Sequence, residues 1–144
     1  MSEQSSKRKP RITHLALKVE NVEQAAKLFK EVFGFVETSC YMSIGNSHQS
    51  LHLSDGTIDL ALLTFQSEDG KMATIAGSEP CIHHFGIDVD DPVAYAKALE
   101  DAGAELIDDP ENPGTKTIKF RVPGGGGIGE ISPPSWHERN LTDA

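Results

Sequence analysis

Ile82-His83-His84-Phe85-Gly86-Ile87-Asp88-Val89 alternates between two kinds of side chain along its length. Its odd-numbered residues are mostly apolar, and its even-numbered residues are small or polar after Ile82. A period of two over eight residues predicts a strand with one face on a core and the other face in a wetter environment. Asp90-Asp91-Pro92 follows and predicts a helix start, because Asp caps helices and Pro suits the first turn.

The same pattern of strand, cap and helix occurs 70 residues earlier, in Ile12-Thr13-His14-Leu15-Ala16-Leu17-Lys18-Val19-Glu20-Asn21. This offset aligns His14 with His84 and Val19 with Val89. Both histidines are therefore expected in the same strand phase, on the face opposite the large apolar residues. A repeat of this length predicts a fold built from two copies of one module.

Each copy is predicted to contain a strand, a helix and three further strands, which makes the fold class α+β. Module one is expected at residues 12–65 and module two at 82–132, joined by a polar linker at 66–81. The segment 66–80 lacks periodicity and is interpreted as a linker or a binding loop. Residues 1–11 are expected to be a flexible tail, and 133–144 a polar C-terminal tail. The predicted elements lie at 12–19, 21–33, 35–44, 48–53 and 57–65 in module one, and at 82–89, 92–102, 105–108, 115–122 and 128–132 in module two.

The composition excludes several classes of partner. The formal net charge of −9 argues against nucleic acid or an anionic membrane, since both need a basic surface. No apolar run approaches the ~20 residues of a membrane span, and the polar first ten residues lack the apolar core of a signal peptide. Cys40 and Cys81 are expected to be reduced thiols, with a single disulfide as the alternative, so a cytoplasmic location is expected.

Three residues form a candidate metal site: His14, His84 and Glu130. The histidines come from equivalent strands, and Glu130 interrupts an apolar strand, where an isolated charge would need a partner or a cation. Two imidazoles and one carboxylate on one side of a metal leave other coordination positions open to substrate. The alternative is that these are ordinary polar strand residues. His83 is expected to point to the helix side or the strand end.

The chain resembles the vicinal oxygen chelate superfamily, which includes glyoxalase I, extradiol dioxygenases, methylmalonyl-CoA epimerase and the fosfomycin- and bleomycin-resistance proteins. The resemblance spans about 12–132 and rests on residues 12–19, 28–35 and 83–91 and on Gly129-Glu130-Ile131. It implies two βαβββ modules in a half-closed, barrel-like mixed sheet around a metal cleft. It also places His14, His84 and Glu130 on metal-ligand positions. The fourth ligand position of the family aligns with Leu62, which has no oxygen donor, and the substitutes considered are Asp59 or water.

A His/His/Glu site is similar to that of the extradiol dioxygenases, so a dioxygenase-like enzyme with Fe(II) is favoured, with Mn, Ni, Zn or Co as other candidate ions. The substrate is expected to be a small molecule whose two adjacent oxygens chelate the metal. The alternatives are a glyoxalase I-like lyase or an epimerase/isomerase, and a small-molecule binding or resistance protein without turnover. A homodimer is expected by analogy with the family.

Other residues are candidates for roles around the metal. His48 and His52 share one face of a predicted strand and are candidate acid–base catalysts beside Glu130, or else exposed strand residues. Tyr41 is a candidate phenol donor to the substrate. Lys119 and Arg121 share a strand face and are candidates to hold a substrate anion, or else a solvated face.

Overall fold

A computed structural model of the chain describes residues 9–42, 48–65, 71–107 and 117–134, and of residues 41 and 42 it describes the backbone alone. Most of the tails predicted at 1–11 and 133–144, namely residues 1–8 and 135–144, lie outside the described residues, as does the expected structure at 43–47, 66–70 and 108–116. No helix in the described part is long and apolar enough to span a membrane.

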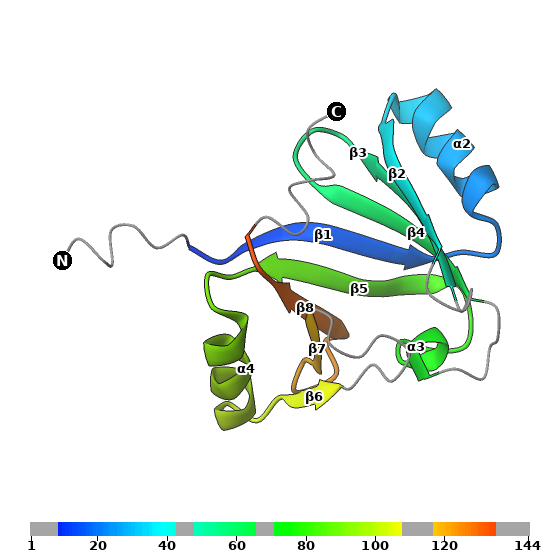
Figure 1. Cartoon of the computed structure of the whole chain (residues 1–144). Helices are drawn as coiled ribbons and strands as arrows, with labels where there is room; N and C mark the ends of the chain where they lie inside the picture. The colour runs from blue at the N-terminus through cyan, green and yellow to red at the C-terminus, as the bar shows by residue number, and fades with distance from the viewer. Residues whose placement is uncertain (1–8, 43–47, 66–70, 108–116, 135–144) are drawn as a thin grey trace.

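The elements follow the predicted order of two βαβββ units (Figure 1). In the first unit they are β1 (Arg11–Lys18), α2 (Val22–Phe33), β2 (Val36–Met42), β3 (His48–Ser54) and β4 (Asp59–Phe65). In the second they are β5 (Cys81–Asp88), α4 (Pro92–Asp101), β6 (Glu105–Ile107), β7 (Ile118–Arg121) and β8 (Ile128–Ser132). Several ends of elements differ from the predicted ones; β4, for example, begins at Asp59 rather than at 57. A short helix, α3 (Lys71–Thr74), lies within the segment that was interpreted as a linker or a binding loop.

The eight strands form one mixed sheet in the order β2-β3-β4-β1-β5-β8-β7-β6. β1 and β5 pair antiparallel at its centre, while β1 pairs parallel with β4, and β5 with β8. The two units are therefore related by a pseudo-twofold arrangement about the β1/β5 pair. This open, mixed sheet confirms the predicted fold class, and Figure 1 shows one long helix beside each half of it.

Helix α2 is defined at both ends by local chemistry. The Asn21 side chain accepts a hydrogen bond from the backbone N–H of Gln24, and Gly34 ends the helix with φ 73°, a conformation that glycine adopts without strain. The buried face of α2, at Val22 and Ala26, packs on the sheet. The sheet contributes Leu51, Leu53, Leu60 and Leu62 to this cluster. Burying each such leucine contributes roughly 2 kcal/mol.

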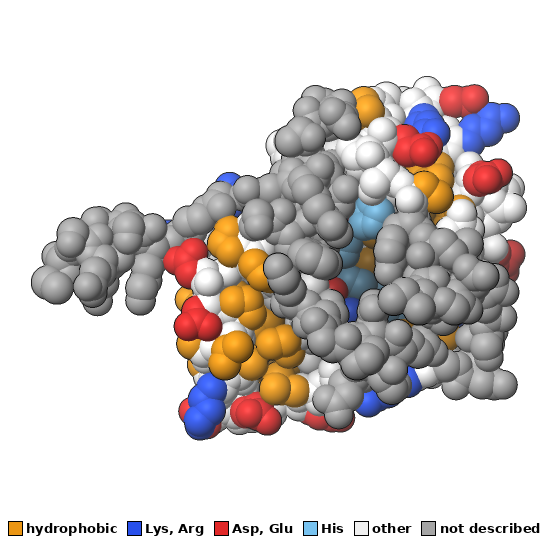
Figure 2. All heavy atoms as spheres, viewed as in Figure 1, with side chains coloured by type: hydrophobic (Ala, Val, Ile, Leu, Met, Phe, Trp, Pro, Cys, Tyr) orange, Lys and Arg blue, Asp and Glu red, His pale blue; other side chains and the backbone are white. Residues whose placement is uncertain are grey.

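Helix α4 covers the other half of the sheet less completely. Asp91 caps it by accepting from the backbone N–H of Ala94, and Pro92 occupies its first turn. Its residues Ala96 and Leu99 pack against a cluster formed by Val89, Ala104, Phe120 and Ile131. None of the residues in this fully described helix is itself buried, and Val93 is 76% exposed. Apolar side chains accordingly gather on the surface over α4 (Figure 2).

The central β1/β5 pair contains two irregularities that matter for the site. The pairing skips Thr13 between Ile12 and His14, and it skips His83 between Ile82 and His84. Each is a β-bulge, in which one extra residue on a strand breaks the simple alternation of side chains. Thr13 and His83 are 70 residues apart, so the bulges occupy equivalent places in the two units. As a result, both Thr13 and His14, and both His83 and His84, are buried.

Candidate metal centre

The three residues predicted to bind metal lie together. His14 on β1, His84 on β5 and Glu130 on β8 are only 3%, 6% and 4% exposed, and each offers one ligand atom within 4.8 Å of the others. The Nε2 atoms of His14 and His84 are 3.1 Å apart, and His84 Nε2 is 3.5 Å from Glu130 Oε2. All three side chains belong to one chain. Figure 2 shows histidine side chains on this face of the molecule.

The strand register explains this meeting. His14 pairs with Gly86 across β1 and β5, and Gly86 pairs with Glu130 across β5 and β8, so His14 and Glu130 flank the same glycine. A Cβ on Gly86 would lie 2.8 Å from the Cβ of His14, closer than two such carbons approach. Glycine at position 86 therefore gives the His14 side chain the space in which it reaches the other two ligands.

The hydrogen bonds of His14 assign its protons. Its Nδ1 lies 3.0 Å from Asp59 Oδ2 and 3.1 Å from the Asp59 carbonyl oxygen. Both oxygens accept hydrogen bonds, so the proton of the neutral ring is on Nδ1 and the lone pair is on Nε2. A carboxylate behind a histidine is the usual partner that orients a metal-binding ring. The lone pair of His14 thus points at the space between His84 and Glu130.

Burial also keeps His84 ready to bind a cation. It lowers the pKa of His84 well below the ordinary 6.5, although the nearby Glu130 carboxylate acts to raise the pKa. The ring is therefore neutral at neutral pH and carries one lone pair. A neutral imidazole is the form that ligates metal ions.

The donor geometry fits a divalent ion. Two donors about 2.1 Å from one ion lie about 3.0 Å apart at a right angle and about 3.4 Å apart at the tetrahedral angle. The observed 3.1 and 3.5 Å are close to these separations. A set of two imidazoles and one carboxylate suits Fe, Zn, Ni, Co and Mn. Lys119 Nζ, 3.2 Å from Glu130 Oε2, supplies positive charge to the same carboxylate.

The structure corrects the predicted fourth ligand position. Leu62 lies in the cluster beneath α2, on the other face of the sheet from the histidines. Ala16 and Gly86 are equivalent in the repeat; Ala16 pairs with Ala61, whereas Gly86 pairs with Glu130. Ala61 is therefore the structural counterpart of Glu130. Its methyl group has no donor atom for a metal ion.

Asp59 has a role that strand phase did not reveal. It is completely buried and lies on the site face of β4, paired with His14, where its two carboxylate oxygens contact two histidines. Oδ2 contacts His14 as described, and Oδ1 is 2.7 Å from His52 Nδ1. His52 thus donates from Nδ1 and has its lone pair on Nε2, which is 3.3 Å from Ser50 Oγ. Both carboxylate oxygens of Asp59 therefore contact histidine rings, which orients His14 and His52.

The other predicted residues make contacts of their own, and one of them, Lys119, reaches Glu130. The ring of His48 packs against Phe65, with centroids 5.7 Å apart. Lys119 is part-buried beside Glu130, whereas Arg121 contacts Glu105 on the next strand and donates to the carbonyl of Ile75. Tyr41 pairs with Ser50 through its backbone, and its side chain lies outside the described atoms.

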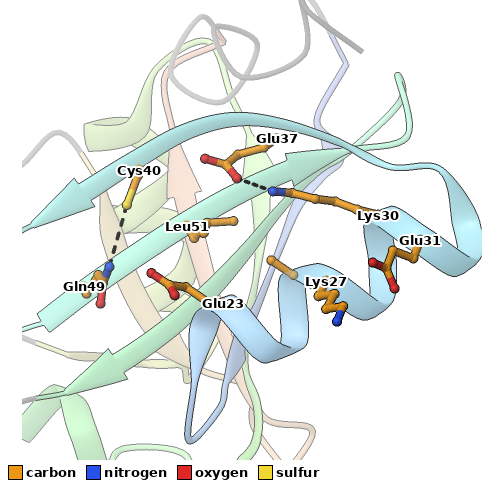
Figure 3. A pocket seen from close by; sticks show the side chains of 9 residues that line it. Glu23, Lys27, Lys30, Glu31, Glu37, Cys40, Gln49 and Leu51 are labelled. Carbon is orange, nitrogen blue, oxygen red and sulfur yellow. Dashed lines mark hydrogen bonds and ion pairs between the residues drawn. The ribbon is translucent and has the colours of Figure 1, made fainter.

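A separate pocket of about 410 Å³ lies between α2 and strands β2 and β3 (Figure 3). It is on the other face of the sheet from the metal centre, because Leu51 in its lining belongs to the cluster beneath α2. Charged side chains surround it, including the ion pair of Lys30 and Glu37. No feature of the sequence predicted this pocket.

Comparisons with known proteins agree with the fold. A family model described as "Glyoxalase/Bleomycin resistance protein/Dioxygenase superfamily" matches residues 11–128. None of the curated proteins that were compared matches the sequence. Among solved structures, a hypothetical protein, BH1468 from Bacillus halodurans C-125, is similar, with a TM-score of 0.72 and 17% identity, covering 86% of this chain and 94% of that one.

Two similar structures have named activities. Methylmalonyl-CoA epimerase from Mycobacterium tuberculosis has a TM-score of 0.65 and 17% identity, covering 85% of this chain and 87% of its own. A mutant of 4-hydroxymandelate synthase from Streptomyces coelicolor has a TM-score of 0.68 and 18% identity, covering 85% of this chain and 38% of its own. At these identities the likeness shows a shared fold.

Proposed function

The chain belongs to the glyoxalase/bleomycin resistance protein/dioxygenase superfamily, and from this premise we propose that it is an enzyme that depends on a divalent metal ion. His14, His84 and Glu130 would hold the ion. The observation that supports this most directly is the convergence of three buried ligand atoms within 4.8 Å of one another. The His14 ring, whose lone pair is directed there by Asp59, adds to that support.

The proposed substrate is a small molecule with two adjacent oxygens. Three protein ligands leave about three positions of an octahedral ion open, enough for a chelating substrate and one further molecule. When bound, Fe(II) would supply oxygen-activating chemistry, and any of the candidate ions would polarise the substrate oxygens. Ala61 at the fourth position favours the more open, dioxygenase-like site over one with four protein ligands.

The protein's own contribution is proton transfer and charge compensation. His52 Nε2 is the basic atom of an Asp59–His52 pair, and it would take a proton from a substrate hydroxyl. Asp59 would stabilise the resulting imidazolium, which it contacts at 2.7 Å. Lys119, with Arg121 further along β7, would balance the negative charge of a deprotonated substrate.

The same pair of residues favours a second candidate function, a lyase or isomerase reaction of the glyoxalase or epimerase type. Such a reaction needs a base that removes and returns a proton next to a polarised carbonyl, and the Asp59–His52 pair provides one without oxygen chemistry. The third candidate function is a protein that binds a small molecule without converting it.

Metal analysis followed by an activity screen separates these functions. Protein purified without chelator is expected to contain about one divalent ion per chain. Reconstituted with Fe(II), Mn, Ni, Zn or Co, it should be assayed on catechols, on adducts of α-ketoaldehydes with thiols, and on acyl-CoA esters. Oxygen uptake with a catechol supports the dioxygenase, and turnover of the other substrates without oxygen uptake supports the lyase or isomerase. A stoichiometry near zero after reconstitution would exclude the metal enzyme.

We also propose that the protein is a homodimer. Helix α4 exposes apolar side chains, among them Val93 at 76%, as expected where chains pair. Light scattering at micromolar concentration should give twice the chain mass of 15.6 kDa, and a monomer mass would contradict the proposal. A cytoplasmic location accords with Cys40 and Cys81, which are both free in the described structure.

A further inference from the structure

The bulge in β5 brings His83 next to the metal ligand that follows it. Simple alternation would turn the two side chains to opposite faces, whereas here their Nδ1 atoms are 2.8 Å apart and their rings meet edge to face. His83 Nε2 lies 2.6 Å from the carbonyl oxygen of Met72 in α3. His83 thus lies between the ring of His84 and the backbone carbonyl of Met72. Its side chain is shielded from solvent, because the residue is only 2% exposed.

We call this chain of contacts, from His84 through His83 to the Met72 carbonyl, the relay. It determines which nitrogen of each of the two rings carries the hydrogen. A carbonyl oxygen accepts, so His83 Nε2 carries the hydrogen and donates to Met72. The Nδ1 of neutral His83 then has a lone pair, and it accepts the hydrogen on Nδ1 of His84. The remaining nitrogen of His84, Nε2, is left with its lone pair toward His14 and Glu130. We infer that His83 is a positioning residue that selects the metal-binding tautomer of His84, an inference that rests on the proposed metal centre.

The Met72 carbonyl, at the end of the relay, belongs to a segment that packing and hydrogen bonds hold in place. Met72 and Ile75 are buried in a cluster with Ile107 and Ile128. Lys18 Nζ donates to the carbonyls of Ala73 and Ser78, at 2.7 and 3.1 Å, and so ties the segment around α3 to β1. The short helix therefore acts as a fixed acceptor.

Without the relay, the surroundings of His84 favour the wrong tautomer. A hydrogen on His84 Nε2 would point at two acceptors: the lone pair of His14 Nε2 at 3.1 Å and Glu130 Oε2 at 3.5 Å. That tautomer puts a proton where the metal ion would bind. His83 opposes it by offering Nδ1 of His84 a buried acceptor at 2.8 Å.

Two substitutions separate this role from simple packing. His83→Leu fills space but offers no acceptor, whereas His83→Asn can place its side-chain oxygen where Nδ1 was and keep the acceptor. In metal-free protein, nitrogen-15 NMR of the imidazole rings reports which nitrogen of His84 is protonated, with His84→Ala used to assign the signals. Wild type and His83→Asn are expected to show an unprotonated Nε2, and His83→Leu a protonated one.

Calorimetric titration with Zn²⁺ gives the second measurement. The affinity of His83→Leu should fall about ten- to a hundredfold, the usual effect of losing the partner behind a ligand, and that of His83→Asn should fall much less. An unchanged tautomer and affinity in His83→Leu would overturn the inference, as would equal losses in the two variants. If wild type binds neither Zn²⁺ nor any of the other candidate ions, the proposed function fails, while the NMR result still decides whether the relay sets the tautomer.

Discussion

Replacing Glu130 by glutamine is expected to lower the affinity for divalent ions more than about a hundredfold, because removing a partner behind a ligand already costs ten- to a hundredfold. Glu130 is the charged member of the ligand set, and it is 4% exposed. Its amide analogue keeps the shape of the side chain but loses the negative charge that attracts the cation. Metal content after reconstitution, measured by elemental analysis, should drop from about one ion per chain to a small fraction.

The matched control for this variant is Glu105→Gln. Glu105 lies in the same half of the sheet, is 70% exposed at its side chain and pairs with Arg121 rather than with the histidines. The same chemical change at that site should leave metal content intact. Circular dichroism must show both variants folded, since Lys119 loses its ion-pair partner in Glu130→Gln. Equal metal content in wild type and Glu130→Gln would remove Glu130 from the ligand set.

The convergence of His14, His84 and Glu130 was predictable because it follows from the repeat. Two copies of one module placed His14 and His84 in equivalent strands, and the paired β1 and β5 bring equivalent positions together. Glu130 was predictable because a carboxylate in an apolar strand needs a partner. These arguments use only residue types and the alternation of side chains along a strand, and both can be read from the sequence.

The features of the site that were not predicted depend on the register of paired strands and on β-bulges. The counterpart of Glu130 was expected at Leu62 and is Ala61, because a strand alignment that is wrong by one residue assigns a side chain to the other face of the sheet. The direction of the His83 side chain depends on a bulge, which strict alternation excludes. The role of Asp59 depends on its pairing with His14, and β4 follows β1 only after three other elements.

The pH dependence of metal binding should be displaced toward acid by burial. A metal ion needs both rings neutral, so any ring that is protonated in the free protein must release its proton on binding, and affinity falls as pH falls. Burial, the main cause, lowers the pKa of His84 well below 6.5. His84 therefore competes for protons only well below that value. Its contribution to the loss of affinity begins in this more acidic range, rather than at the unperturbed ~6.5 of imidazole.

Acid also destabilises the fold itself, so metal titrations at low pH need a control for unfolding. Burial lowers the pKa of His83 to about 4 from 6.5, so between these values the unfolded chain binds more protons than the folded one. The free energy of unfolding accordingly rises with pH in this window and falls on acidification, on the order of 3 kcal/mol for His83. Denaturation in urea at each pH shows where the protein remains folded, and titrations are restricted to that range.

Calorimetric titration of wild type and His84→Ala at pH 7.5 and at pH 5.5 then tests the centre. Each titration is run in two buffers of different ionisation enthalpy, so that the protons released on binding can be counted. Wild type should bind tightly at pH 7.5 with little proton release from His84, and its loss of affinity at pH 5.5 should be smaller than the roughly tenfold per pH unit expected below pH 6.5 for each ring with the unperturbed value. His84→Ala should bind weakly at both values, because only His14 and Glu130 remain. Equal affinity and equal proton release in the two proteins would show that the ion binds elsewhere, for instance at His48, and would exclude the three-ligand centre.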